Sequence, residues 1–151
     1  MDVIIRDLVE SDYYEICELL KETITNKYEI NDIKNDDLNM FINEKIENIK
    51  NYILNFPKDE KYKIVIVEQE LVGIGGIYPI CESIKKNIEG LNSNDLEIGS
   101  INIKREFQKM GLSKALMKEL INILMQRGIE KFYLGCGYTT SQTYWKNVFG
   151  E

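Results

Sequence analysis

The chain has 151 residues, 44% of them hydrophobic and 29% charged, which suits one globular domain over residues 1–151. Its net charge of −6 argues against a nucleic-acid binder, which needs clustered Lys and Arg. The chain has no histidine, which excludes Ser-His-Asp and Cys-His catalysis and histidine metal sites. The three cysteines, Cys17, Cys81 and Cys136, form no closely spaced pair, so we expect reduced thiols, no metal and a cytoplasmic location. No apolar run approaches membrane-spanning length.

The first half of the chain predicts a strand followed by two helices. Val3 and Ile5 are predicted to face the core from the strand, and Cys17 to be a small core residue of the first helix. The second helix is either one long amphipathic helix or two shorter ones, and it ends before Pro57. The expected elements are a strand over 3–8, a helix capped by Ser11, a polar stretch over 26–37 and the helix that begins at Leu38.

The middle of the chain predicts a hairpin. Residues 62–67 are almost all β-branched and indicate a buried strand, and a tight turn at 68–70 leads to an antiparallel partner over 71–78. The glycines of that partner, Gly73, Gly75 and Gly76, do not form a dinucleotide fingerprint, because Pro79 follows rather than a helix. Glycine inside a strand indicates a bulge or a close approach of another group. Residues 80–95 are polar and weakly patterned, which predicts a long loop.

The most informative pattern lies in the second half. An alternating strand over 96–103 enters a short polar loop, and Gly111 then opens an apolar helix that ends at Gly128. A helix start leaves backbone N–H groups without intrahelical partners, which suits an anion such as a diphosphate. The last expected elements are a strand over 130–134 and a helix that begins at Thr139 or Thr140. Because a helix joins 96–103 to 130–134, those two strands should be parallel in an otherwise mostly antiparallel sheet.

These residues resemble the GNAT superfamily of acyl-CoA N-acyltransferases. The family's pyrophosphate motif is (Gln/Arg)-x-x-Gly-x-(Gly/Ala), and the chain has Gln108-Lys-Met-Gly111-Leu-Ser113 between a strand and a helix. Serine replaces the usual Gly or Ala at the last position and is also small. The opening residues 3–12 are similar to the family's first strand and Asp-initiated helix. The resemblance covers nearly the whole chain, and it implies a GNAT-like α/β fold with a mixed sheet flanked by helices.

The resemblance implies acetyl-CoA as the acyl donor, with no metal. The pyrophosphate would accept hydrogen bonds from the backbone N–H groups of Gln108, Lys109, Met110, Gly111, Leu112 and Ser113. The pantetheine arm would pair with the backbone around Ile101 and Ile103 like an added strand. The side chains of Lys104, Arg105, Lys109 and Lys114 either attract the phosphates or are ordinary surface charges.

The resemblance also implies a general base and a tyrosine acid. Glu97, near the start of the strand before the motif, fits the family's carboxylate base. The alternative is that Glu97 is an ordinary exposed glutamate at the end of a strand. The acid is expected on the last helix, where Tyr144 or Trp145 occupies the family's tyrosine position, depending on a one-residue shift. Tyr144 is the preferred assignment and Tyr138 the fallback.

The expected activity is acetyl transfer to a primary amine of a small molecule or a protein, with no nucleic acid or membrane partner. The alternatives are an inactive acyl-CoA-binding regulatory module and, less well supported, a nucleotide-binding regulatory domain, which would need a phosphate-loop lysine. The family usually adds strands after the last helix, whereas this sequence stops at Glu151. The C-terminal strands are therefore expected to be missing, because the chain is truncated, because another subunit supplies the last strand, or because the sheet is short. An uncovered edge would favour a homodimer.

Overall fold

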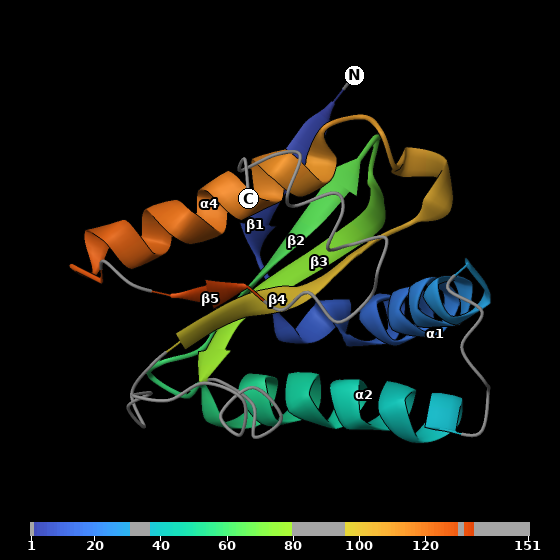
Figure 1. Cartoon of the computed structure of the whole chain (residues 1–151), viewed down its shortest axis with the longest axis horizontal. Helices are drawn as coiled ribbons and strands as arrows, with labels where there is room; N and C mark the ends of the chain where they lie inside the picture. Colours follow the sequence, from blue (N-terminus) through green and yellow to red (C-terminus); the bar gives the residue numbers. More distant parts are fainter. Residues whose placement is uncertain (1, 31–36, 80–95, 130–131, 135–151) are drawn as a thin grey trace.

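The computed structural model describes residues 2–30, 37–79, 96–129 and 132–134 of the chain (Figure 1). In the described residues the strands and helices follow the predicted order. They are β1 (Val3–Asp7), η1 (Glu10–Asp12), α1 (Tyr13–Ile30), α2 (Leu38–Asn55), β2 (Lys61–Val67), β3 (Glu70–Pro79), β4 (Leu96–Ile103), η3 (Arg105–Phe107), α4 (Leu112–Gln126) and β5 (Tyr133–Leu134). The second helix is thus one continuous helix. Several predicted features lie outside the described residues, namely the 80–95 loop with Cys81, and Cys136, Tyr138, Tyr144, Trp145 and the last helix.

The five strands recorded in the described residues form one sheet in the order β1-β2-β3-β4-β5. Its first three pairings are antiparallel and the β4–β5 pairing is parallel. This confirms the predicted mixed sheet, in which the crossover through α4 makes its two flanking strands parallel.

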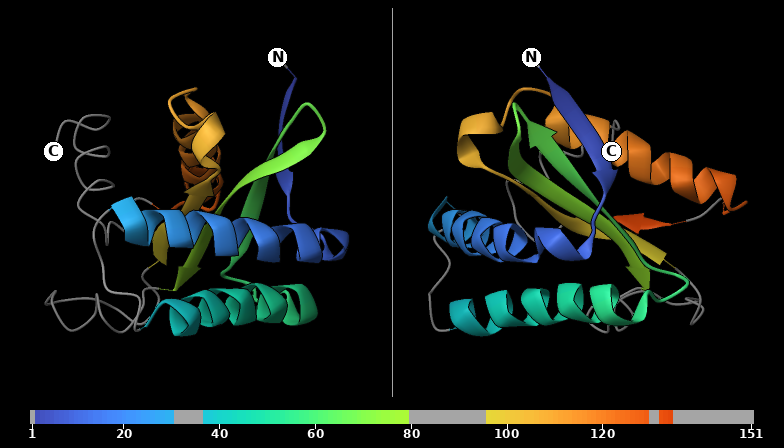
Figure 2. Two further views of the ribbon diagram at one scale, coloured as in Figure 1. Left: turned by 90° about the vertical axis from the view of Figure 1, so that its right-hand side faces the viewer. Right: turned by 180° about the vertical axis from the view of Figure 1, so that it is seen from behind.

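The sheet lies between two helical layers, with α1 and α2 on one face and α4 on the other (Figure 2). Each layer has its own hydrophobic core. The α1/α2 core contains Ile16, Leu20, Ile64 and Ile74, and the α4 core contains Val65, Ile98, Leu116 and Leu120. In the described part of the chain, no helix is both long enough and apolar enough to cross a membrane.

Several sequence predictions for the first half need correction. Val3 is 38% exposed, because β1 is the edge strand and its start projects beyond the helices (Figure 1). Cys17 is partly exposed instead of buried. The first helix continues into the polar stretch as far as Ile30, because Tyr28 extends its apolar face by one more turn and packs against Phe41 of α2.

The glycines of β3 mark both a bulge and a close approach, as predicted. The register of the β3–β4 pairing shifts between Ile74 and Gly76. A Cβ at Gly76 would lie 2.5 Å from the ring of Tyr62, so only glycine lets the strand pass under that ring. The turn before β3 is also confirmed, with Glu68 and Gln69 both in the left-handed conformation that suits a tight hairpin.

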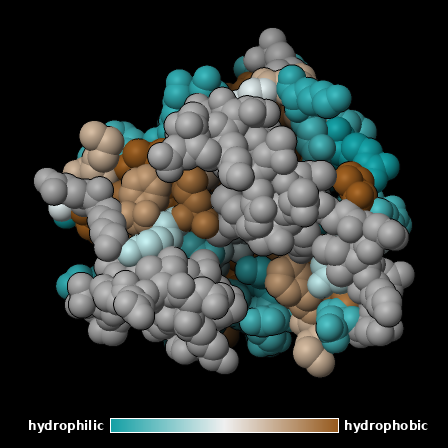
Figure 3. Space-filling view, viewed as in Figure 1, coloured by the Kyte–Doolittle hydropathy of each residue, from teal (hydrophilic) through white to brown (hydrophobic). Residues whose placement is uncertain are grey.

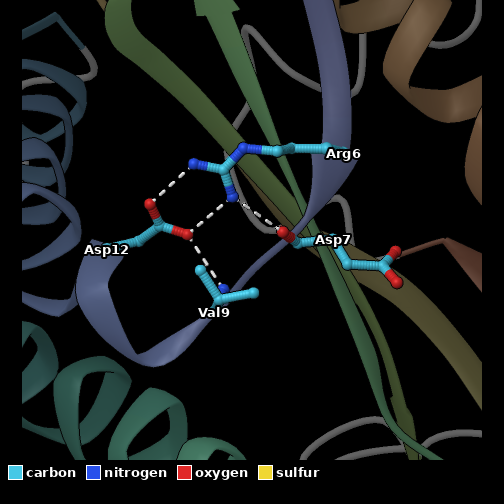
Figure 4. Close-up of polar contacts among 4 residues, drawn as sticks. All are labelled: Arg6, Asp7, Val9 and Asp12. Atoms are coloured by element: carbon cyan, nitrogen blue, oxygen red, sulfur yellow. Dashed lines mark hydrogen bonds and ion pairs between the residues drawn. The ribbon is translucent and has the colours of Figure 1, made fainter.

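The entry to α1 depends on Asp12, whereas the sequence pattern indicated Ser11 as the cap. The Asp12 carboxylate accepts two hydrogen bonds of 2.9 Å from the Arg6 guanidinium and a third from the Val9 N–H (Figure 4). Arg6 also donates to the Asp7 carbonyl. Burial by itself raises the pKa of Asp12, but the hydrogen bonds from Arg6 and Val9 outweigh it, so the net shift of this pKa is downward. The bidentate pair thereby joins β1 to α1.

We predict that Asp12→Asn lowers the free energy of unfolding by about 1–2 kcal/mol near neutral pH, a modest value because Arg6 is partly exposed. The folded-state pKa of Asp12 is depressed, so its contribution is present above the ordinary aspartate pKa and disappears as pH falls through the folded-state value. Urea unfolding of both proteins at a series of pH values measures this. A gap between the two proteins that stayed constant into strong acid would contradict the prediction.

Candidate functional site

The loop between β4 and α4 has the geometry of an anion site. The N–H of Phe107 donates to the Lys104 carbonyl at 2.9 Å, which closes a 3₁₀ turn, and the backbone then passes through Lys109 at φ 67° and Gly111 at φ 78°. Alternation of right-handed and left-handed residues points successive N–H groups toward one side. Gly111 is the N-cap of α4, so the predicted helix start is confirmed.

The first intrahelical hydrogen bond to the Gly111 carbonyl comes from Ala115 N–H, at 3.0 Å. The N–H groups of Leu112, Ser113 and Lys114 precede it and have no carbonyl within the helix to bind. Leu112 is 5% exposed and anchors this first turn in the α4 core. The N-terminus of α4 is therefore held rigidly, with several N–H donors and the positive end of the helix dipole directed out of the helix.

Gln108 and Lys104 take part in the loop differently from the sequence prediction. The Gln108 N–H donates to the Arg105 carbonyl at 3.2 Å and its side chain donates to the Ile103 carbonyl at 3.0 Å, so Gln108 ties the loop to β4. The Lys104 ammonium pairs with Glu70 at 2.9 Å, and that hydrogen bond raises the pKa of Lys104. Lys104 is thus engaged with the β2–β3 turn, while Arg105, Lys109 and Lys114 are exposed.

The backbone of β4 presents Ile101 and Ile103 toward the side of β5. Lys104 N–H donates to the Val72 carbonyl of β3, and successive residues of a strand alternate in direction, so Ile101 and Ile103 point away from β3. The Ile101 carbonyl accepts a hydrogen bond of 2.6 Å from the Lys27 ammonium of α1. Each carbonyl oxygen has a second lone pair, so an additional donor can still bind at this edge.

Glu97 lies on the α1/α2 face of β4 and is 4% exposed. It is therefore not an ordinary exposed strand-end residue. Its register partner Tyr78 points a hydroxyl at it, with 3.5 Å between the hydroxyl and Glu97 Oε2, and the same hydroxyl lies 3.2 Å from Ser100 Oγ. Ser100 has φ 53°, a left-handed conformation at the irregular part of the β3–β4 pairing.

Two lysines from different helices reach the same part of β4. Lys45 of α2 donates to Ser100 Oγ at 3.1 Å, and its ammonium lies 5.7 Å from the centre of the Tyr78 ring. Lys27 of α1 donates to Asn102 Oδ1 at 2.8 Å as well as to the Ile101 carbonyl. Burial and the positive charge of Lys45 together lower the pKa of Lys27 to about 8.

Sequence reasoning found Glu97 and the loop but missed Lys27, Tyr78 and Ser100. These residues meet only after α1 and α2 pack on the sheet, and none of them belongs to a local motif. Lys45 carried a weak signal, because it occupies a position on the otherwise apolar stripe of the second helix. Among the described residues, no three Cys, Asp or Glu side chains come together in a way that could hold a metal ion.

The surface seen in Figure 3 mixes hydrophilic and hydrophobic areas, and one of the hydrophobic areas lies over α4 and β5 at the left of the view. α4 exposes Met125 to 68%, and the two described residues of β5 are both partly exposed.

The mixed sheet with one parallel pair, and the loop with left-handed residues that leads into α4, match the fold of the GNAT acyltransferases. The chain matches the model of the acetyltransferase (GNAT) family over residues 14–146, and it belongs to that family. Comparison with curated proteins found no match.

Solved structures of low sequence identity share the fold. PaiA N-acetyltransferase from Thermoplasma acidophilum, in complex with coenzyme A, is 21% identical with a TM-score of 0.76, over 97% of this chain and 89% of that one. A GCN5-related N-acetyltransferase from Ralstonia eutropha is 12% identical with a TM-score of 0.73, over 98% and 92%. A predicted acetyltransferase from Clostridium acetobutylicum, with acetyl-CoA, is 14% identical with a TM-score of 0.68, over 98% and 89%.

Proposed function

We propose that this protein transfers an acetyl group from acetyl-CoA to a primary amine of a small molecule or a protein. The observation that carries the proposal is the juxtaposition on β4 of a buried carboxylate, Glu97, and the strand edge at Ile101 and Ile103 that leads into the helix start. Membership of an acetyltransferase family and the coenzyme A and acetyl-CoA bound to the Thermoplasma and Clostridium proteins support the choice of donor.

In this proposal, the N–H groups from Lys109 to Ser113 receive the pyrophosphate, and Gln108 holds the loop in place through its bond to Ile103. The pantetheine arm lies along the edge of β4 at Ile101 and Ile103 and uses the second lone pairs of their carbonyl oxygens. Exposed Arg105 and Lys109 add favourable charge near the phosphates, with no need for a metal ion.

The chemistry requires a neutral amine and a proton for the leaving thiolate. Glu97 takes the proton of the acceptor ammonium. The amine nitrogen then attacks the thioester carbonyl, the C–S bond breaks, and the thiolate of coenzyme A takes a proton from Tyr144, which lies outside the described residues. The tyrosinate takes the second proton, which the nitrogen loses as the amide forms. The ammonium groups of Lys27 and Lys45 disfavour a positive charge on the acceptor and so assist its deprotonation.

Ligand-dependent thermal stability and thiol release test this function. Acetyl-CoA and coenzyme A should each raise the melting temperature, because a ligand that binds only the folded state stabilises it. Addition of an amine panel to the acetyl-CoA complex should then release free thiol. Stabilisation by ATP alone would refute the proposal, and coenzyme A binding without transfer to any amine would favour an acyl-CoA-binding module.

We predict that Gly111→Ala weakens coenzyme A binding by about tenfold, because alanine disfavours the left-handed conformation that aims the loop N–H groups. Gly128→Ala is the matched control. Gly128 has φ 76° at the other end of α4, and a Cβ at either glycine meets no other atom within 4 Å. The two variants should lose similar stability, and calorimetric titration should find weaker coenzyme A binding only in Gly111→Ala. If the two variants bound coenzyme A with equal affinity, the loop would not be part of the coenzyme site.

A further inference from the structure

The proposed base is too deep to meet an acceptor amine directly. Glu97 is 4% exposed, whereas Tyr78 and Ser100, on the same face of the sheet, are both partly exposed. Their hydroxyls form a chain toward the carboxylate, from Ser100 Oγ to the Tyr78 hydroxyl at 3.2 Å and from that hydroxyl to Glu97 Oε2 at 3.5 Å. The second distance is long for a hydrogen bond, and such bonds commonly shorten when substrate binds.

Each hydroxyl of Ser100 and Tyr78 has one proton, and this number decides which of them donates in each hydrogen bond. Tyr78 has one hydroxyl proton, which it directs to the Glu97 carboxylate. The contact between the two hydroxyls therefore needs Ser100 as its donor. Ser100 Oγ accepts a hydrogen bond from the Lys45 ammonium at one of its two lone pairs. One lone pair of Ser100 Oγ is left, at the end of the row of hydroxyls away from Glu97.

Gly99 provides the space for this chain. A Cβ at Gly99 would collide with the Tyr78 hydroxyl and would lie 3.2 Å from Glu97 Oε2. Any other residue would separate the hydroxyl from the carboxylate. The left-handed backbone of the next residue, Ser100, turns its side chain onto the same face as Tyr78 and Glu97. The strand is thus built locally so that three polar side chains meet on one face.

We propose that Ser100 and Tyr78 carry the proton of the acceptor amine to Glu97. This inference rests on the proposed function and adds two residues to it. The ammonium N–H donates to the remaining lone pair of Ser100 Oγ. As its proton passes to Ser100, the Ser100 proton passes to the Tyr78 oxygen and the Tyr78 proton to Glu97. The amine is left neutral, Glu97 becomes a carboxylic acid, and both hydroxyls regain one proton each.

Two amines of different basicity separate a relay from a structural role. A simple alkylamine is protonated at neutral pH and needs the relay, whereas a fluorinated alkylamine of low basicity is already neutral and does not. Tyr78→Phe and Ser100→Ala should lower kcat/KM for the alkylamine by about 100-fold and for the fluorinated amine by less than about threefold. Tyr62→Phe is the control, because its buried ring stacks on Tyr78 with centroids 6.2 Å apart and it loses the same hydroxyl group.

The outcomes distinguish this inference from the proposed function. Equal losses for both amines in Tyr78→Phe would mean a structural role and overturn the relay, as would full activity of that variant with the alkylamine. A loss in Tyr62→Phe as large as that in Tyr78→Phe would also overturn it. In those cases the wild-type protein still acetylates amines and the proposed function stands. A wild-type protein that binds no coenzyme A or acetylates neither amine overturns both.

Discussion

Replacement of Glu97 with glutamine should lower kcat/KM for the acceptor amine by about 100-fold or more, the usual contribution of a positioned general base. Glutamine keeps the shape of the side chain and an oxygen that can accept the Tyr78 hydrogen bond, so the fold should not change. It has no carboxylate to take a proton. Steady-state thiol release measures the loss, and coenzyme A affinity should be the same in both proteins.

The control for this prediction is Glu44→Gln, which removes the same charge from an exposed side chain of α2. Its rate should match that of the wild-type protein. A second variant, Tyr144→Phe, tests the proposed acid. If Glu97→Gln acetylated amines at the wild-type rate, the base would have to be assigned to another group, even though the family assignment would stand.

Leu116→Ala should lower the free energy of unfolding by about 2–5 kcal/mol. The side chain of Leu116 is 0% exposed and lies in the α4 core, where its removal opens a cavity between the helix and the sheet. That loss is a large part of the total stability of a typical domain, which is about 5–15 kcal/mol. Urea unfolding measures it, with Leu54→Ala as the matched control, because Leu54 is 70% exposed.

Gly75→Ala provides a sharper test of the same packing. A Cβ at Gly75 would lie 2.9 Å from Leu116 Cδ2, so this variant alone should be overpacked and destabilised by about 1–3 kcal/mol. In the double variant, the new methyl group enters the space that Leu116 leaves. The double variant should therefore lose clearly less than the sum of the two single losses. Additive losses within about 0.5 kcal/mol would show that the two positions do not share this space.

The sequence predicted those parts of the fold that depend on local patterns. Hydrophobic periodicity predicted the helices and strands, and the glycines at 111 and 128 predicted both ends of α4, because each occupies a left-handed position that other residues disfavour. The crossover through that helix predicted the parallel pair. Errors occurred where solvent exposure depends on other elements, as at Val3 on the edge strand and Cys17 on α1.

The candidate site also has a part that the sequence predicted and a part that only the structure shows. The sequence by itself determined where α4 begins, since the glycine at 111 suits the left-handed position that precedes the helix. It also indicated Glu97 as a candidate, but its burial required the structure. The cluster of Lys27, Lys45 and Ser100 was decided only by the tertiary structure. Its members come from two helices and a strand. The hydrogen bonds that Lys27 and Lys45 donate to β4 span up to 75 residues of sequence, a distance over which no local pattern carries information.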